Sequence, residues 1–466
     1  MNATTREQGA REWRSLWLIL LLGFALRVGL GVLHPSIAHP DEIFQYQEPA
    51  HRFLTGLGVP SWEWNHHIRS WFIPGLVLPI MASVRIFTHD PVIYFDVIAL
   101  LLSLASLPVI WVAFIWGRQE GGHEGGIVAG LLAAVAFQLV YFSSHLLMDT
   151  LAVDLLLPAL YACREYRRHG SLRSLAVGCA SLAVLAFVRP QIAPVLLFPG
   201  IATLRAAKHR GQMLPGMTWS LGPLLVLGGL DWITLGTPFQ SIWRYIYINL
   251  FRVADDFGVA PFYWYLKNML LAWTIAVVPI GYFSGRAASK FRVEFVTAWL
   301  IVALLSAIQH KEARFILPAE AILLILAGVG IAQCRFGHTR AIAATICATS
   351  LALCFTPTFF PHLSRGHAEL RAMNQIMQRP DACGIYFLPR PSLLNFSGYT
   401  GARDGVALRS DRFDTATENL RRANYIVTWL QPDETATVPP DYSRLDCRND
   451  TSGRQICVYR RPGACG

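Results

Sequence analysis

Long apolar stretches separated by short polar joins make up the first 357 residues of the chain. The apolar stretches lie at 16–33, 92–116, 127–143, 146–163, 174–188, 190–204, 217–234, 264–284, 294–309, 314–334 and 341–357. Stretches of this length predict membrane-spanning helices, and those that are short or contain proline are typical of kinked helices inside a bundle. The pattern therefore predicts an α-helical polytopic membrane protein with about 11–13 transmembrane helices.

Two segments of this pattern are open to more than one interpretation. The first apolar run could be a cleaved signal peptide, but its length, its Arg27 and the spans that follow favour an uncleaved signal-anchor. Residues 73–87 are apolar but short and contain two prolines. Whether 73–87 crosses the membrane stays open.

Basic residues between the apolar runs predict the orientation. They gather at 164–173, 205–210, 286–292 and 335–340, and such loops face the cytoplasm in membrane proteins. The opposite, exported face then holds the loop 34–91, the joins 189–191, 235–262 and 310–313, and everything after residue 357. The excess of 40 Lys and Arg over 30 Asp and Glu is explained by these loops, so no nucleic-acid partner is expected.

The last part of the chain, 358–466, is polar. Short runs typical of β-strands lie at 384–388, 425–430 and 455–459, with a helical stretch at 415–423. This pattern predicts a small exported α/β domain after a membrane body of residues 1–357. Four cysteines fit disulfides in an exported domain, with the pairing left open: Cys383, Cys447, Cys457 and Cys465.

Composition excludes several classes. Hydrophobic residues make up 53% of the chain and charged residues 15%, against about 25% charged residues in soluble domains. A soluble enzyme, a fibrous protein and a disordered chain are therefore excluded.

The first exported loop holds the strongest candidate chemistry. After His39 and Pro40, the residues Asp41, Gln45, Glu48 and Arg52 follow at the spacing of one helix face. Ionisable groups beside a membrane span are costly unless they serve a site, so Asp41 is the first candidate for catalysis and Glu42 the second. Acids in a first helical turn and an ordinary Glu48–Arg52 pair are the alternative interpretation.

Two tryptophans follow in the same loop. Trp62 and Trp64 could stack on the apolar face of a sugar, or could belong to the aromatic belt at the membrane surface. Taken alone, the tryptophans favour the belt.

A second charged cluster, 309–315, joins two apolar runs on the same expected face. Lys311 and Arg314 are donors suited to phosphate oxygens, although basic side chains at helix ends also reach for the membrane surface. Arg189, His145, Asp149 and Asp231 are weaker candidates near the exported ends. The glycine-rich segment 121–126 lacks a phosphate-loop ending and is expected to be a flexible turn.

Missing motifs narrow the chemistry further. The sequence has no Asp-x-Asp triplet, no dinucleotide-binding fingerprint and no Gly-x-Ser-x-Gly elbow. A group-transfer enzyme with a site on the exported face also has no access to cytoplasmic nucleotides. Its donor is then expected to be a sugar already carried on a membrane lipid.

Taken together, these segments resemble the glycosyltransferase 22 family, the mannosyltransferases of GPI-anchor and N-glycan precursor assembly. The resemblance rests on His39-Pro40-Asp41-Glu42 with Phe44-Gln45, Glu48 and His51, on Trp62-Glu63-Trp64, on Ile68-Arg69-Ser70, on His310-Lys311-Glu312-Ala313-Arg314-Phe315, and on Asp231–Asn249 followed by Pro261–Tyr265. It covers about 39–318.

The family resemblance implies a GT-C fold and a membrane glycosyltransferase. The donor would be a polyprenyl- or dolichyl-phosphate mannose, the acceptor a glycan or glycolipid, and the anomeric carbon would be inverted. Asp41 would be the base, and Glu42 would orient the acceptor or share that work. Neither a metal nor a cofactor is expected. A bacterial relative in the inner membrane with its site toward the periplasm is favoured, with an ER membrane and a lumenal site as the alternative.

The expected substrate-binding residues lie in these exported segments: His39, Gln45, Glu48, Trp62, Trp64, Arg69, Arg189, His310, Lys311 and Arg314. Of these, Lys311, Arg314 and either Arg189 or Arg69 are expected to neutralise the leaving lipid phosphate. The competing class is a transporter or flippase of lipid-linked sugars. Such proteins usually contain structural repeats, and no repeat is seen in this sequence.

Overall fold

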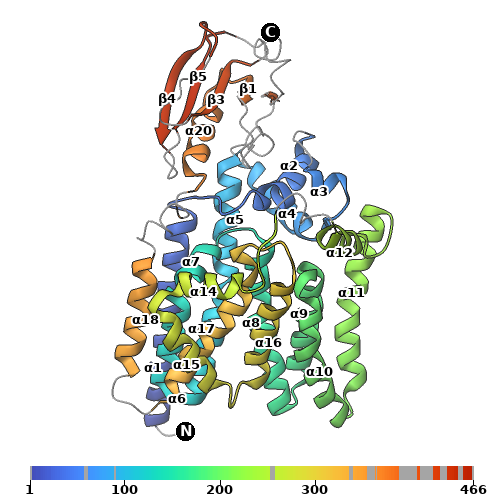
Figure 1. Ribbon diagram of the computed structural model, residues 1–466, viewed down its shortest axis with the longest axis vertical. Helices are drawn as coiled ribbons and strands as arrows, with labels where there is room; N and C mark the ends of the chain where they lie inside the picture. Colours follow the sequence, from blue (N-terminus) through green and yellow to red (C-terminus); the bar gives the residue numbers. More distant parts are fainter. Residues whose placement is uncertain are drawn as a thin grey trace.

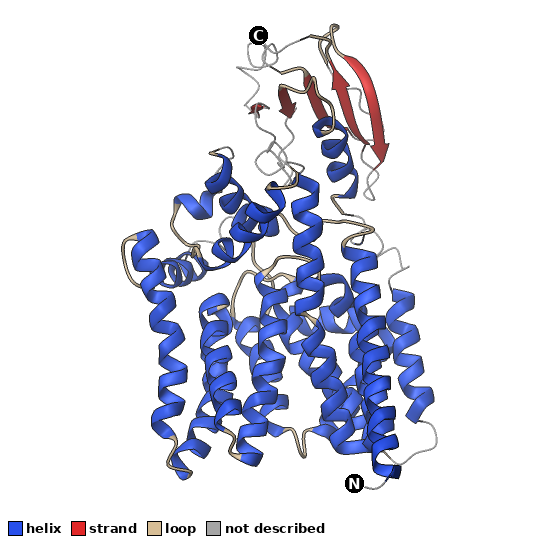
Figure 2. Ribbon diagram, turned by 180° about the vertical axis from the view of Figure 1, so that it is seen from behind, coloured by secondary structure: helices blue, strands red, loops and turns tan. Residues whose placement is uncertain are grey.

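A helical bundle carries a small β-sheet at one end in the computed structural model (Figure 1). The structure describes residues 3–56, 61–88, 91–251, 258–334, 339–353, 363, 365–387, 407–409, 423–430, 438–449 and 455–463. Seen from behind, the sheet stands clear of the bundle, and the short helices between them mark the end of the molecule where the expected site loops lie (Figure 2).

The N-terminal half of the bundle contains the following elements: α1 (Ala3–Gly31), the π-helical turn η1 (Glu42–Gln47), α2 (Glu48–Thr55), α3 (Trp62–Asn65), α4 (Phe72–Arg85), α5 (Pro91–Ala105), α6 (Leu107–Val135), α7 (Phe137–Phe142), α8 (Met148–His169) and α9 (Leu172–Val188). The second half continues with the 3₁₀ turn η2 (Pro190–Ile192), α10 (Ala193–His209), α11 (Met213–Leu235), α12 (Gln240–Phe251), α14 (Trp264–Trp273), η3 (Thr274–Ala276), α15 (Val277–Ala287), α16 (Arg292–Ala307), η4 (Ala313–Ile316), α17 (Leu317–Ala332) and α18 (Thr339–Leu353).

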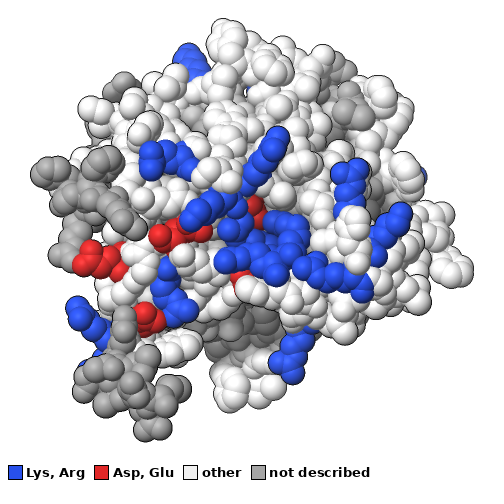
Figure 3. Space-filling model, turned by 90° about the horizontal axis from the view of Figure 1, so that it is seen from below, with Lys and Arg blue, Asp and Glu red and all other residues white. Residues whose placement is uncertain are grey.

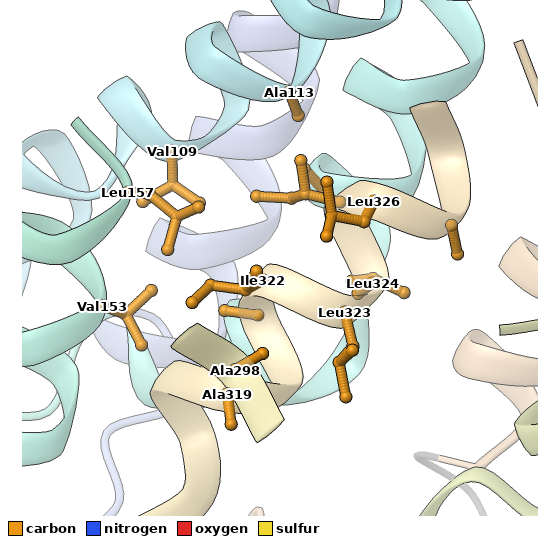
Figure 4. Close-up of a cluster of buried hydrophobic side chains, with 14 of the residues drawn as sticks. Val109, Ala113, Val153, Leu157, Ala298, Ala319, Ile322, Leu323, Leu324 and Leu326 are labelled. Carbon is orange, nitrogen blue, oxygen red and sulfur yellow. The ribbon is translucent and has the colours of Figure 1, made fainter. Parts of the chain in front are cut away.

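Helix α17 is the centre of the bundle. Residues 317–331 are all buried, which its apolar sequence on every side requires. The side chains labelled in Figure 4 are Ala319, Ile322, Leu323, Leu324 and Leu326 of α17 itself, Val109 and Ala113 of α6, Val153 and Leu157 of α8, and Ala298 of α16. Gly330 lets α15 approach closely, because a Cβ there would lie 1.9 Å from the carbonyl oxygen of Phe283.

The sequence placed the helices correctly but not all of their breaks. The expected run 127–143 is interrupted at Ala136, and 264–284 is interrupted at Thr274, which has φ 47°. The glycine-rich turn is a sharp reversal inside α6, with non-helical backbone at Gly121 and Gly122. The two halves of α6 then pack so closely that a Cβ on Gly117 would meet the Gly125 carbonyl oxygen at 2.3 Å.

Several helices are long enough to cross a membrane. In the described part of the chain, five helical segments meet the length and composition of a span, or six if α9 and α10, bent by 116° at residue 189, form one span. Helix α4 has 14 residues and falls short of a span. The multi-pass membrane character is therefore confirmed, and the count of about 11–13 spans stays a prediction.

Basic side chains gather on the end of the bundle away from the sheet (Figure 3). Three of the basic joins meet there: Arg164 donates to the Lys290 carbonyl oxygen at 2.7 Å, and Arg210 donates to that of Arg167 at 3.0 Å. The fourth join, 335–340, lies largely outside the described residues. The joins thus share one face, as the charge pattern predicted, and that this face is cytoplasmic stays a prediction.

The C-terminal region contains α20 (His367–Met377) and a five-stranded sheet of order β2-β1-β3-β5-β4. Its strands are β1 (Gly384–Phe387), β2 (Ala407–Arg409), β3 (Tyr425–Leu430), β4 (Ser443–Asn449) and β5 (Gln455–Arg460). Strand β1 pairs in parallel with β2 and β3, and β5 pairs in antiparallel with β3 and β4.

Three of these strands match the expected runs, and the small C-terminal sheet is confirmed. The residues of the expected helix 415–423 lie, except for Ala423, outside the described part, as does the boundary expected at 357. Cys447 and Cys457, which are opposite one another on β4 and β5, form a disulfide. Cys383 is also disulfide-bonded, and Cys465 lies outside the described residues. Helix α20 and strands β2 and β4 were not foreseen, because their sequences are short and carry little apolar periodicity.

Candidate active site

A cavity of about 310 Å³ lies at the end of the bundle nearest the sheet, where the first loop and the 310–315 join meet. Six parts of the chain contribute walls: residues 39–45 up to and within η1, the turn around α3, the start of α8, the α9–α10 bend, α12 and the 310–315 join. Its charged and polar lining residues are His39, Asp41, Gln45, Ser61, Glu63, Arg69, Asp149, Arg189, Tyr245, Asn249, His310, Glu312 and Arg314.

An ion pair joins the two predicted clusters, and both of its residues line the cavity. The Arg314 guanidinium donates to Asp41 Oδ2 at 2.7 Å, although the two residues are 273 positions apart in the sequence. Arg314 also donates to Glu312 Oε2 at 2.7 Å. His39 Nδ1 lies 3.1 Å from Asp41 Oδ1, and His310 Nε2 lies 3.3 Å from Glu312 Oε1. The two clusters thus form one network.

This network controls the ionisation of its carboxylates. Burial by itself raises the pKa of Asp41, but the Arg314 charge and the His39 contact outweigh burial and hold that pKa well below its usual value. Burial likewise opposes ionisation of Glu312, and the His310 and Arg314 contacts lower its pKa to about 2. Both carboxylates are therefore ionised at neutral pH.

A second buried pair supports the first from behind. Asp149, at the start of α8, holds the Arg189 guanidinium at 2.7 Å, and its other oxygen lies 3.8 Å from Arg314 Nε. Arg189 also lies over the Phe315 ring, 4.7 Å from its centre. Asp149 and Arg189 are almost fully buried, and buried charges persist only when paired. The pair fixes the bend between α9 and α10 against the 310–315 join.

A third group connects η1 to the turn around α3. Glu63 Oε1 accepts from Arg69 at 2.5 Å and from the Gln45 amide at 2.9 Å. Burial raises the pKa of Glu63 against the lowering effect of Arg69. Arg69 in turn lies 5.3 Å from the centre of the Tyr245 ring on α12. Three segments around the cavity are thereby held in one arrangement.

Most of the predicted site residues line this cavity: His39, Asp41, Gln45, Trp62, Arg69, Arg189, His310 and Arg314. Four others do not: Glu42, Glu48, Trp64 and Lys311. The chemical roles assigned to the lining residues stay predictions.

Glu42 points away from the cavity. Its carboxylate accepts the Ala38 backbone N–H at 2.8 Å and lies 3.0 Å from His145 Nδ1, with the residue 1% exposed. Through these contacts Glu42 braces the loop that carries Asp41, and its expected role toward the acceptor stays a prediction.

Glu48 does not lie on the same helix face as Asp41 and Gln45, because the backbone between them is not a regular α-helix. The turn that carries Gln45 is a π-helix with i→i+5 hydrogen bonds, so the 3.6-residue spacing does not hold across it. Asp41 and Gln45 line the cavity, whereas Glu48 is buried away from it and Arg52 is exposed.

Lys311 is occupied by the backbone. Its ammonium donates to the carbonyl oxygen of Ile308, to that of Ala260 at 2.9 Å and to that of Gln309 at 3.5 Å. The contacts that Lys311 makes are therefore structural, and its expected contact with a phosphate stays a prediction. Lys311 holds the start of the 310–315 join to the segment before α14.

The two tryptophans lie in different surroundings. Trp62 lines the cavity and is 44% exposed, so its ring is accessible to a ligand. Trp64 donates its indole N–H to the Gln45 carbonyl oxygen at 3.2 Å and packs edge-on against Trp71. Trp64 therefore supports the loop instead of facing a ligand.

A second cavity of about 340 Å³ adjoins the first and shares His39, Glu312 and Arg314 with it. Its other walls are mostly apolar side chains of α7, α14 and α17. A polar cavity at the end of the bundle thus continues into an apolar one between the helices.

Several lining residues were absent from the sequence-based site. Glu63 and Glu312 lie inside the two motifs, and Asp149 was a weak candidate, so the motifs pointed to all three. Tyr245 and Asn249 recur at i and i+4 on α12, a spacing that could have placed them on one face. In the described residues, no group of three His, Cys, Asp or Glu side chains could hold a metal ion.

Comparison with known proteins shows the family of the chain. The model of the Alg9-like mannosyltransferase family matches residues 17–387, so the chain belongs to this family. Mannosyltransferase APTG1 of Arabidopsis thaliana is 25% identical over 331 residues, which cover 68% of this chain and 58% of that protein. GPI mannosyltransferase 3 of Yarrowia lipolytica is 24% identical over 325 residues, 68% of this chain and 62% of that protein. The chain thus spans about three fifths of the relatives it matches.

A solved structure shows the fold. ArnT from Cupriavidus metallidurans, bound to undecaprenyl phosphate, aligns with a TM-score of 0.60 at 11% identity and covers 97% of this chain and 98% of its own. The same protein in the apo state gives a TM-score of 0.57 at 13% identity. The expected GT-C fold is confirmed.

Proposed function

We propose that this protein transfers mannose from a polyprenyl- or dolichyl-phosphate mannose to a hydroxyl group of a glycan or glycolipid, with inversion at the anomeric carbon. The observation that carries the proposal is the Asp41–Arg314 pair: Asp41 lines the polar cavity, and Arg314 lines both the polar and the apolar cavity. Membership of the Alg9-like mannosyltransferase family supports mannose as the sugar. The undecaprenyl phosphate named for ArnT supports a lipid phosphate as its carrier.

The reaction needs a base and a stabilised leaving group. The acceptor oxygen attacks the anomeric carbon while its proton passes to an Asp41 oxygen. The bond from that carbon to the phosphate oxygen breaks, and the lipid phosphate leaves with the electron pair. Attack and departure on opposite faces of the sugar invert the anomeric carbon. A phosphate leaving group is already a weak base, so it needs positive charge more than a proton.

Arg314 couples donor binding to the strength of the base. In the unliganded site Arg314 keeps the pKa of Asp41 low, which makes Asp41 a poor proton acceptor. An incoming phosphate competes with Asp41 for the same guanidinium. As Arg314 turns toward the phosphate, the pKa of Asp41 rises and the carboxylate gains basicity. The base is thus strengthened when the donor is in place.

The polar cavity suits the sugar and the acceptor. Trp62 offers an accessible flat ring on which the apolar face of a sugar can stack. Gln45 and Asn249 line the same cavity with amide groups that can form hydrogen bonds with sugar hydroxyl groups. On this proposal His39 and His310 hold the two carboxylates of the network. Arg69 and Arg189 keep the surrounding loops in register through their own acidic partners.

The site is assigned to the exported side of the membrane. The basic joins lie at the opposite end of the bundle (Figure 3), which supports a cytoplasmic position for that end. The site then faces the periplasm in a bacterial inner membrane, or the lumen in an ER membrane. The C-terminal sheet lies on the same side as the site (Figure 1).

The test uses the purified full chain in lipid nanodiscs with radiolabelled polyprenyl-phosphate mannose and a lipid and glycan extract. Wild type is expected to move label into a new product, whose anomeric configuration opposes that of the donor by NMR. Asp41→Asn is expected to lower the rate at least a thousandfold and to leave the fold intact, since it keeps the shape but not the basicity. Half of the samples contain a chelator, and the rate is expected to be unchanged there.

Two outcomes would contradict the proposal. Near-full activity of Asp41→Asn would exclude Asp41 as the base. Absence of transfer by wild type, together with passage of a lipid-linked sugar across sealed vesicles, would favour the flippase class instead.

A further inference from the structure

The arginines around the two cavities differ in whether a carboxylate lies next to them. Arg69, Arg189 and Arg314 each lie within ion-pair distance of a carboxylate. Arg365 lines the second cavity and has no such partner among the residues that the structure describes. Among the described residues, its guanidinium donates to the Ala38 carbonyl oxygen alone, at 3.3 Å. The preceding stretch 354–364 contains no Asp or Glu in the sequence. Within the described part of the chain, Arg365 thus presents positive charge without an acidic partner to a mostly apolar cavity.

A second polar group in this cavity lacks partners. Gln138 of α7 is 6% exposed, and both its amide nitrogen and its amide oxygen are without a hydrogen-bond partner in the described structure. Leaving a buried amide unsatisfied costs about 1–3 kcal/mol per group. Gln138 lines the same cavity as Arg365. A cation without an acid and an amide without partners, in one cavity, point to an absent polar ligand.

The other walls indicate what that ligand carries. Phe137, Phe142, Leu271, Leu317 and Leu363 line the cavity with rings and branched aliphatic chains. Among the described residues, two carboxylates line this cavity, Glu312 and Glu320. Glu312 is held by Arg314, and Glu320 on α17 accepts the Trp273 indole N–H at 3.2 Å. An anionic group is therefore favoured at the Arg365 side, and an apolar chain along the remaining walls.

We propose that Arg365 and Gln138 bind the phosphate of the lipid-linked donor, with the first isoprene units of its chain in the second cavity. This inference rests on the proposed function and assigns the donor's phosphate to residues that neither sequence motif contains. The second cavity shares Arg314, Glu312 and His39 with the first. A phosphate at Arg365 therefore places the attached sugar toward Asp41. Arg365 would thus supply the positive charge for the phosphate that the sequence analysis expected from Lys311.

The backbone around Arg365 explains its position. The Ile37 N–H donates to the Arg365 carbonyl oxygen at 2.7 Å, and His367 Nδ1 donates to the Pro35 carbonyl oxygen at 2.7 Å. Gly366 adopts φ +72° against Ile37, where an added Cβ would lie 2.9 Å from the Ile37 side chain. Together these contacts form a clasp, which holds residues 365–367 before and at the start of α20 against residues 35–37. Residues 35–37 lead directly into the segment that carries Asp41. The C-terminal domain thereby places one residue of the donor site.

The experiment measures equilibrium binding of labelled undecaprenyl phosphate to the full chain in phosphatidylcholine nanodiscs. Arg365→Ala is expected to weaken binding about tenfold or more, because a charged hydrogen bond is lost, and Arg365→Lys to weaken it less. Gln138→Leu is expected to weaken binding about threefold to tenfold. Arg371→Ala, an exposed arginine on α20 that lines neither cavity, is the matched control and is expected to bind like wild type.

Further arms separate the head group from the chain and from the fold. Undecaprenol, which lacks the phosphate, is expected to bind equally to wild type and Arg365→Ala. Inorganic phosphate is expected to bind far more weakly than the lipid phosphate. In transfer assays Arg365→Ala is expected to raise the KM for the donor and to leave the KM for the acceptor unchanged. Hydrogen exchange over 34–42 reports whether the clasp survives the substitution.

The outcomes separate this inference from the proposed function. Unchanged lipid-phosphate affinity in Arg365→Ala overturns the inference, even if wild type transfers mannose. Equal losses of undecaprenol and undecaprenyl phosphate binding, with faster exchange over 34–42, also overturn it, because they show a structural effect alone. Phosphate-specific loss of binding supports the inference, and if wild type then transfers no sugar, only the proposed function fails.

Discussion

Two clusters of buried charge lie within the helical bundle, around Arg27 of α1 and around Arg314. Arg27 is 1% exposed and donates to Ser106 Oγ at 2.9 Å and to the carbonyl oxygens of Gly23 and Ala134 at 2.9 and 3.1 Å. It shares a cavity of about 10 Å³ with Asp154. Arg314 instead bonds two carboxylates beside cavities of about 310 and 340 Å³.

The comparison shows that buried charge alone does not mark a site. The hydrogen bonds of Arg27 go to backbone oxygens and to the Ser106 hydroxyl, because polar groups inside a membrane protein need partners within the protein. The cavity beside Arg27 has room for no more than about one water. Arg314 is held by carboxylates that a ligand can compete for, next to space in which a ligand fits. The distinguishing features are therefore exchangeable partners and an adjoining cavity.

The largest expected effect separates the two arginines directly. Arg314→Ala is expected to lower the transfer rate by about 10²–10³-fold, as for loss of one donor to a developing negative charge. Arg27→Ala is expected to lower the free energy of unfolding by about 3–5 kcal/mol, since it removes the buried positive charge that shares a cavity with Asp154. The measurements are transfer rate per folded molecule and thermal unfolding in nanodiscs. Similar profiles for the two variants would contradict the comparison.

Asp149 near Arg314 and Asp154 near Arg27 allow the same comparison to be tested on the acidic residues. Asp149→Asn is expected to lower the rate by about tenfold to a hundredfold, because Arg189 and Arg314 both lose their fixed position. Asp154→Asn, the matched change in the Arg27 cluster, is expected to keep the rate per folded molecule. The same rate assay checks both variants, and an active Asp149→Asn would limit the site to the Asp41–Arg314 pair.

The tryptophan pair gives a smaller effect. Trp62→Ala is expected to raise the KM for the acceptor by roughly threefold to tenfold, since its accessible ring is the one that lines the cavity. Trp64→Ala is expected to act mainly on stability, through the lost contacts with Gln45 and Trp71. Steady-state kinetics with varied acceptor distinguish the two. An unchanged KM in Trp62→Ala would assign this residue to the membrane belt.

The smallest expected effect is the pH dependence of stability. The pKa of Glu312 is about 2 in the folded protein against an ordinary 4.5, so its contribution is present above about pH 4.5 and is lost as the pH falls toward 2. Glu312→Gln removes this contribution. The difference in unfolding temperature between wild type and Glu312→Gln is therefore expected to shrink from about pH 7 to about pH 3. A difference that stays constant would show that Glu312 is not held ionised by its neighbours.

Much of the candidate site could be predicted because its residues lie in two short charged segments. Asp41 and Arg314 were both named from the sequence, and so were most of the residues that line the first cavity. Glu42 and Lys311 could not be placed, since a residue type does not reveal whether its side chain meets a ligand, a histidine or three carbonyl oxygens. Arg365 carries no motif, and its importance depends on a clasp to residues 35–38.

Local patterns of residues were enough to predict the membrane bundle, the charged first loop, the 310–315 join, the basic face and the polar C-terminal region. Apolar length and charge are local properties, and the membrane environment gives them a direct structural meaning. Four features became visible with the folded chain: Asp41 touches Arg314, and α6 reverses at Gly121–Gly122. In addition, Glu48 turns away through a π-helical turn, and Arg365 reaches the second cavity. These outcomes depend on packing between distant segments and on backbone geometry at single residues, which local sequence patterns do not encode.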